Sequence, residues 1–117
     1  MVPISLTQLQ SVVMDMALED MHGLYEIIWT LNVSHPGVPK SEKISASRRV
    51  VHALHKEGYI RVHRLQWHPS ADLGSVPPNE LDSVLAAEQS WEAAQEYIGF
   101  VGTGKGAQAR EAGLFAL

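Results

Sequence analysis

The chain has 117 residues, of which 45% are apolar and 19% charged, so it is long enough and apolar enough for one folded domain and is not expected to be disordered. It contains no cysteine, which excludes a disulfide framework, a thiolate metal site and a cysteine nucleophile. Its net charge is −4, no apolar run is long enough to span a membrane and the first residues lack signal-peptide features, so we expect a cytoplasmic protein without a membrane partner.

Two amphipathic helices are predicted at the start of the chain. Ser5 and Gln8 have the spacing of a capping box, in which each side chain satisfies a free backbone N–H of the other residue. Apolar residues then recur at helical spacing in residues 9–16 and again in residues 24–31. Residues 20–23 either separate two helices or lie within one bent helix, and we favour two helices.

A loop and a third helix are predicted next. Residues 33–39 contain two prolines and a glycine, which is typical of a loop. The helix is expected to begin at Pro39 or Ser41 and to end before Gly58, because glycine adopts the left-handed conformation without a side-chain clash. Its buried face should consist of Ile44, Ser47, Val51 and Leu54.

Two strands are predicted in the second half of the chain, in residues 59–67 and 96–101, where β-forming residues are frequent. Each strand lacks another partner, so the two should pair with each other. Between them we expect a loop over residues 68–78 and then a helix that begins at Asn79. Its apolar residues are Leu81, Val84, Leu85 and Trp91.

A short helix over residues 107–115 should close the chain after a glycine-rich break. Helices packed on one small hairpin define an α+β domain. The basic residues are concentrated in residues 36–68, which hold seven Lys or Arg against two acids, whereas the remainder holds two against eleven. Such asymmetry indicates an anion-binding surface, the alternative being an ordinary solvated face.

Residues 46–60 end a predicted helix in Leu54, three polar residues, Gly58 and two apolar residues. This pattern resembles the recognition helix and first wing strand of the winged-helix regulators, the MarR-like and PadR-like families. Residues 100–106 are similar to the closing wing strand and the threonine–x–x–glycine of the next helix. Residues 24–32 are similar to the helix that supports the recognition helix.

The resemblance implies one winged helix-turn-helix-like domain over residues 1–117, mostly helical, with a two-stranded β-hairpin wing that carries a helical insertion. Residues 1–20 would form an N-terminal helix suited to dimerisation. Residues 21–67 and 97–110 would form the winged-helix core, and residues 68–96 the wing insertion. The implied function is a transcriptional regulator that binds double-stranded DNA as a homodimer.

This sequence departs from the family at three places. The second helix of the helix-turn-helix is reduced to a turn at residues 35–39, Ser47 replaces a buried aliphatic residue, and the wing insertion is far longer than a hairpin loop. The alternative function is therefore a protein-interaction module, of an accessory or immunity type, on the same scaffold without DNA binding.

The resemblance also implies a set of DNA-binding residues. Arginine suits guanine because its planar fork donates two parallel hydrogen bonds. The residues expected to face base edges and phosphates are Ser45, Ala46, Arg48, Arg49 and His52. The residues expected to neutralise phosphates are Lys40, Lys43, Arg61, His63 and Arg64.

Two other kinds of site have partial signals in the sequence. Residues 99–106 nearly match the phosphate-binding P-loop, but Gly106 stands where a hydroxyl must bind magnesium. Four histidines could supply metal ligands, although titratable surface histidines are the simpler interpretation: His52, His55, His63 and His68. We therefore expect no enzyme activity, no catalytic residue, no cofactor and no metal site.

The three tryptophans, Trp29, Trp67 and Trp91, are expected to pack in the core and the hairpin rather than to form a base-stacking platform. Trp67 ends the basic strand and is therefore the strongest candidate of the three for a binding role.

Overall fold

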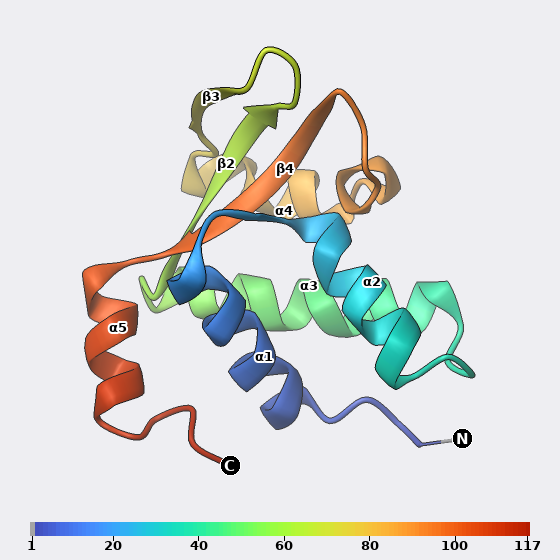
Figure 1. Ribbon diagram of the computed structural model, residues 1–117, viewed down its shortest axis with the longest axis vertical. Helices are drawn as coiled ribbons and strands as arrows, with labels where there is room; N and C mark the ends of the chain where they lie inside the picture. The colour runs from blue at the N-terminus through green and yellow to red at the C-terminus, as the bar shows by residue number, and fades with distance from the viewer. Residues whose placement is uncertain (1) are drawn as a thin grey trace.

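The computed structural model describes residues 2–117 and shows an α+β fold, with five α-helices and a four-stranded antiparallel sheet in that part of the chain (Figure 1). The elements in chain order are α1 (Leu6–Glu19), β1 (His22–Gly23), α2 (Leu24–Ser34), α3 (Lys40–Lys56), β2 (Ile60–Gln66), β3 (Ala71–Ser75), α4 (Pro78–Ala86), the 3₁₀-helix η1 (Glu88–Trp91), β4 (Glu96–Gly102) and α5 (Gly104–Glu111).

The predicted start of α1 and end of α3 are confirmed, whereas α4 begins at Pro78 instead of Asn79 and α5 spans Gly104–Glu111 instead of residues 107–115. The Ser5 side chain caps α1 by accepting a hydrogen bond from the Gln8 backbone N–H at 3.2 Å. The predicted break between α1 and α2 is present, and β1 fills it. Gly58 follows α3 with a φ of 77°, the left-handed conformation that glycine adopts most readily. These local signals position α3 between a short turn and the start of β2.

The sheet has the strand order β1-β4-β2-β3. The predicted pairing of the two long strands is confirmed, because β2 and β4 run antiparallel from the Ile60–Gly102 pair to the Gln66–Glu96 pair. The prediction of only two strands is wrong. β1 pairs with β4 through two residues, and β3 pairs with β2 inside the segment predicted as a loop. Both extra strands are edge strands whose pairing depends on distant residues, so no local pattern marks them.

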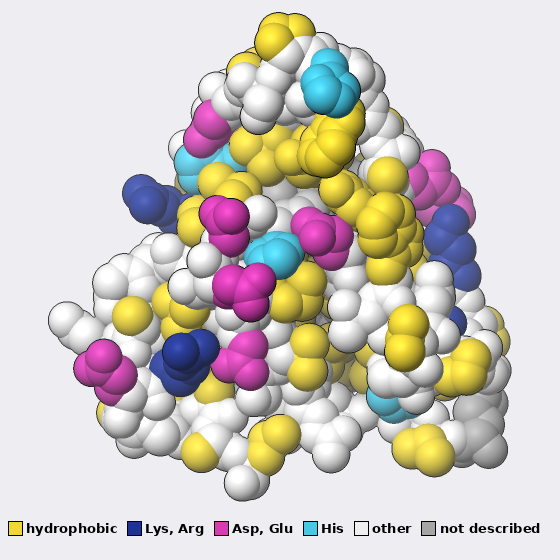
Figure 2. Space-filling model, viewed as in Figure 1, with side chains coloured by type: hydrophobic (Ala, Val, Ile, Leu, Met, Phe, Trp, Pro, Cys, Tyr) yellow, Lys and Arg dark blue, Asp and Glu magenta, His cyan; other side chains and the backbone are white. Residues whose placement is uncertain are grey.

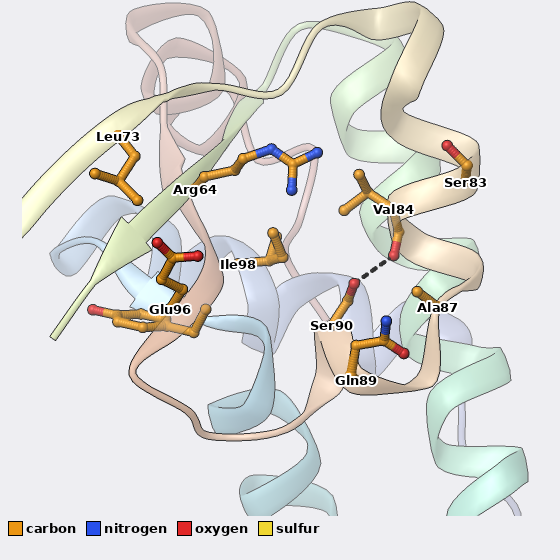
Figure 3. A pocket seen from close by; sticks show the side chains of 10 residues that line it. Arg64, Leu73, Ser83, Val84, Ala87, Gln89, Ser90, Glu96 and Ile98 are labelled. Carbon is orange, nitrogen blue, oxygen red and sulfur yellow. Dashed lines mark hydrogen bonds between the residues drawn. The ribbon is translucent and has the colours of Figure 1, made fainter.

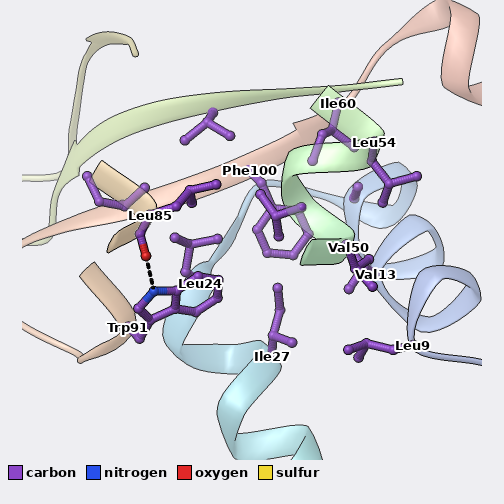
Figure 4. Close-up of a cluster of buried hydrophobic side chains, with 14 of the residues drawn as sticks. Leu9, Val13, Leu24, Ile27, Val50, Leu54, Ile60, Leu85, Trp91 and Phe100 are labelled. Atoms are coloured by element: carbon purple, nitrogen blue, oxygen red, sulfur yellow. Dashed lines mark hydrogen bonds between the residues drawn. The ribbon is translucent and has the colours of Figure 1, made fainter. Parts of the chain in front are cut away.

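Helices α1, α2 and α3 lie on one side of the sheet (Figure 1). Phe100 of β4 is fully buried, and side chains from all three helices surround it (Figure 4). The inserted segment, residues 68–96, contributes to the same hydrophobic cluster through Leu81, Val84, Leu85 and Trp91. The segment is therefore built into the core rather than attached to the outside of the domain.

Two polar features of the core depart from the sequence-based expectations. Trp91 belongs to η1 instead of α4, because α4 ends at Ala86, and its indole N–H donates to the Leu85 carbonyl at 3.0 Å (Figure 4). Ser47 is fully buried, and its hydroxyl donates to the Lys43 carbonyl at 2.7 Å. This bond within α3 satisfies the hydroxyl that replaces an aliphatic side chain.

The expected core packing is confirmed for Trp91, and Trp67 lies against Tyr97 of β4, the other strand of the predicted hairpin. Trp29 and Trp67 are 57% and 54% exposed, so neither is a core residue. Among the helices of residues 2–117, none combines the length and the apolar character that crossing a bilayer requires.

Candidate nucleic-acid interface

The candidate interface is the outer face of α3. The helix buries Lys43, Ser47, Val50, Val51 and Leu54 against the domain. With 3.6 residues per turn, the opposite face of such a helix is left to solvent. Four of the predicted DNA-binding residues line one open groove on this outer face, together with Asp82 of α4: Ser45, Arg48, Arg49 and His52. The structure thus brings together the residues expected to face base edges, apart from Ala46.

Arg48 and Arg49 are the exposed cations of this groove. Within residues 2–117 neither guanidinium forms an ion pair with a carboxylate of the chain. Each guanidinium presents five N–H donors in a planar fork that matches phosphate oxygens or a guanine edge. These two side chains are therefore available to an anionic ligand.

Two of the other predicted cations form ion pairs with carboxylates of the inserted segment. Lys40 Nζ lies 3.3 Å from a Glu92 carboxylate oxygen, and His52 Nε2 lies 3.1 Å from an Asp82 carboxylate oxygen. All four side chains are about half exposed or more. Such surface pairs contribute little to stability, on the order of 0–1 kcal/mol, so a phosphate can compete for these cations.

His63 of β2 is held more firmly. Its Nδ1 lies 3.0 Å from an Asp72 oxygen of β3, while its Nε2 is buried and has no hydrogen-bond partner in the described chain. The backbone N–H of Gly74 donates to the same carboxylate at 2.9 Å. This bond, and then the His63 ring, lower the pKa of Asp72. His63 therefore joins β2 to β3 and is turned away from an external ligand.

Lys43 and Ala46 take structural positions on α3. Lys43 is only 5% exposed, and its ammonium donates to the Asn32 side chain of α2 at 2.9 Å. That hydrogen bond ties α3 to the helix that supports it. Ala46 is half-buried and lies beside Leu6 of α1. Neither residue presents a group to the groove of Arg48 and Arg49.

The two arginines of β2 lie on opposite faces of the sheet. Side chains alternate between the two faces of a strand, so residues two apart share a face. Val62 faces the core, which puts Arg64 on the core face and Arg61 on the opposite face. Arg64 points toward α4 and lines a pocket of about 340 Å³ with Val84 and Ile98 (Figure 3). Arg61 is exposed on the other face. The predicted cations thus form a cluster on α3 and separate positions on β2, not one continuous ridge.

The glycine-rich segment that resembles a P-loop forms the start of α5. Thr103 caps this helix, and its hydroxyl oxygen accepts from the Gly106 N–H at 3.1 Å. The Lys105 ammonium donates to the Glu57 carbonyl at 2.6 Å and lies 5.4 Å from the centre of the Tyr59 ring. The lysine that would bind a phosphate in a P-loop is therefore used to join α5 to the end of α3.

The candidate metal ligands are dispersed. No cluster of three or more His, Cys, Asp or Glu side chains suited to a metal ion occurs within residues 2–117. His55 is half-buried near the end of α3, and this burial, together with the nearby His52, lowers its pKa.

The structure also places two acidic residues of the inserted segment against α3, which the sequence did not predict: Asp82 beside His52 in the groove and Glu92 beside Lys40. Their only sequence signal is the acidic composition outside residues 36–68. No family model matches the chain, and comparisons with curated proteins and with solved structures found no match.

Proposed function

We propose that this chain is a winged-helix domain that binds double-stranded DNA through α3. Three features support the winged-helix assignment. A five-residue connection joins α2 to α3, α3 leads directly into β2, and β2 pairs antiparallel with β4 as the two strands of a wing would. The inserted β3, α4 and η1 then extend the wing and fold back onto the core.

The observation that carries the DNA-binding proposal is the pair of unengaged arginines on the outer face of α3. An α-helix is about 10–12 Å across, and the major groove of B-DNA is about 12 Å wide, so such a face can enter the groove. Arg48 and Arg49 would donate to guanine edges or phosphates, and the Ser45 hydroxyl would add a further contact. Lys40 and Arg61 would contact the flanking phosphates.

A homodimer through α1 completes the proposal as a transcriptional regulator. The domain measures 38 × 33 × 25 Å. Two copies placed side by side would separate their α3 helices by a distance on the order of 34 Å, one turn of B-DNA. Analytical ultracentrifugation of the free protein tests this part separately, because a purely monomeric chain excludes it.

The experiment is a titration of labelled random-sequence duplex DNA with the protein, followed by fluorescence anisotropy at several salt concentrations. We expect wild-type binding that weakens steeply with salt, and a loss of at least tenfold in affinity for Arg48→Ala combined with Arg49→Ala. Each phosphate contact removed should reduce the slope of log K against log salt by about 0.9. Arg49→Ala alone is compared with Arg110→Ala on α5, which changes the net charge equally.

Equal losses of DNA affinity for Arg49→Ala and Arg110→Ala would mean that binding depends only on net charge and that α3 makes no specific contact with DNA. Absence of wild-type binding at low salt would reject the proposal. It would favour the alternative function, a protein-interaction module. The pairing of Lys40 and His52 with the chain's own carboxylates is also consistent with that alternative.

A further inference from the structure

Four aromatic side chains form a row across the surface: Trp29 and Tyr25 of α2, Tyr97 of β4, and Trp67 directly after β2. Successive ring centres are 4.7, 5.6 and 6.4 Å apart, and each pair is arranged edge to face. Both tryptophans are more than half exposed, and both tyrosines are half-buried. Figure 2 shows a band of hydrophobic side chains that runs from the top of the molecule toward α2.

The row is held in place by the backbone beneath it. A side chain at position 23 would have its Cβ 2.3 Å from the Tyr25 ring, so only glycine allows the ring to lie there. The Trp67 backbone N–H donates to the Gln95 carbonyl at 2.9 Å, which fixes the other end. Tyr97 lies between them, on the face of β4 opposite to the buried Ile98. The rings are thus arranged before any ligand arrives.

An exposed row of this kind is costly in water and is typical of a binding surface. It lies apart from the groove of α3, because none of the four residues of the row lines that groove. The DNA-binding proposal makes no use of it.

The surroundings of the row are acidic. A groove between α1 and α2 continues from Trp29, with carboxylates from Asp15, Glu19 and Glu26 along it and apolar side chains of both helices beneath. Asp15 pairs with Arg110, and His22 lies between Glu19 and Glu26, so the three carboxylates exceed the cations that face them. Figure 2 shows acidic side chains gathered around a histidine near the middle of the face, where His22 lies between Glu19 and Glu26.

The charge of the surface indicates the class of ligand. Nucleic-acid bases could stack on such rings, but the phosphates would be repelled by the carboxylates beside Trp29. A cation would be attracted both by these carboxylates and by the electron-rich face of the indole.

We propose that the aromatic row binds a proline-rich segment of a partner protein, with a lysine or arginine of that segment entering the acidic groove beside Trp29. Proline-rich segments adopt the extended polyproline II helix and dock on aromatic-lined surfaces, where rigid prolines lose little entropy. The helix rises about 3.1 Å per residue, so two residues rise about 6 Å, close to the 5.6 and 6.4 Å steps, and about five to six residues span the row.

The test uses a proline-rich peptide of about ten residues, long enough to exceed the row, that ends in one arginine. The reporters are the indole N–H resonances of the ¹⁵N-labelled full chain. We expect the signals of Trp29 and Trp67 to shift on titration, while that of the buried Trp91 stays unchanged. Trp67→Ala should weaken binding at least tenfold. Leu114→Ala, which removes an equally exposed apolar side chain from the C-terminal segment, should not.

The charge of the ligand is tested with two matched changes. A peptide that ends in glutamate should bind at least fivefold more weakly than the arginine peptide, and Glu19→Gln should reduce this difference. Glu19 is exposed, and within residues 2–117 its carboxylate forms an ion pair with His22 alone, so the variant should fold.

Three outcomes would overturn the proposal. One is the absence of any shift with the arginine peptide. Another is tighter binding of single-stranded oligothymidine than of the peptide, which would make the row a base-stacking platform. The third is self-association of the chain that is lost in Trp67→Ala, which would assign the row to a second copy.

Discussion

Neutralising Asp82 should strengthen DNA binding, because this carboxylate lies inside the proposed interface. It sits 3.1 Å from His52 Nε2 and lines the same groove as Arg48 and Arg49. A phosphate in contact with His52 would lie about 6 Å from it, and two unit charges at that distance repel by about 0.7 kcal/mol even with the dielectric constant of water. Asp82→Asn should therefore raise the affinity about threefold, and more if the contact excludes water.

The assay is the same anisotropy titration at low salt. The control is Glu111→Gln on α5, which removes one negative charge at an exposed position away from the groove. A long-range effect of net charge would tighten both variants equally. Unchanged or weaker binding by Asp82→Asn would refute the reasoning, since it would mean that no phosphate approaches this part of α3.

Three further predictions concern the scaffold. Trp91→Phe removes a donor from a buried carbonyl of α4 and should lower the free energy of unfolding by about 1–3 kcal/mol, measured by denaturant titration. Gly58→Ala should cost about 1–2 kcal/mol in the same assay, because the φ of 77° is unfavourable for alanine, and Gly104→Ala, where no side-chain clash arises, is the comparison. The N–H of Gly74 and then the His63 ring lower the pKa of Asp72, so this carboxylate contributes stability above its ordinary pKa of 3.8, and the contribution is lost as the pH falls through the lowered pKa. Asp72→Asn should therefore show a smaller loss of stability in acid than wild type, and an equal loss in both would contradict the assignment.

The sequence predicts the parts of the fold that depend on neighbouring residues. The positions of α1, α2 and α3 follow from apolar periodicity and from local signals such as Ser5 and Gly58. The long strands β2 and β4 follow from their β-forming residues. The edge strand β3, with the sequence of residues 71–75, contains a glycine and an aspartate, so only its pairing with β2 makes it a strand.

For the surface, the sequence predicts which charged residues each helix carries but not which of them are exposed. The sequence places Arg48, Arg49 and Lys43 on one helix, but the burial of Lys43 depends on how α3 packs against Asn32 of α2. The aromatic row shows the same division. Tyr25 and Trp29 are four residues apart and so adjacent on any helix, whereas Trp67 reaches Tyr97 only through the register of β2 on β4, in which Leu65 pairs with Tyr97.

The inserted segment links the stability of the domain to the charge of its surface. Its residues Leu85 and Trp91 belong to the hydrophobic core, while Asp82 and Glu92, on the same short stretch of chain, lie against the cations of α3. Removing the segment would expose the core and free those cations together, so a deletion could not separate the two effects. Single charge substitutions can, because the carboxylates are exposed and the apolar side chains beneath them stay in place. Because of the position of these carboxylates, any DNA bound to α3 competes with the domain's own acidic groups for the cations. This competition favours ligands whose hydrogen-bond acceptors fit the geometry of Arg48 and Arg49 over ligands that offer negative charge alone.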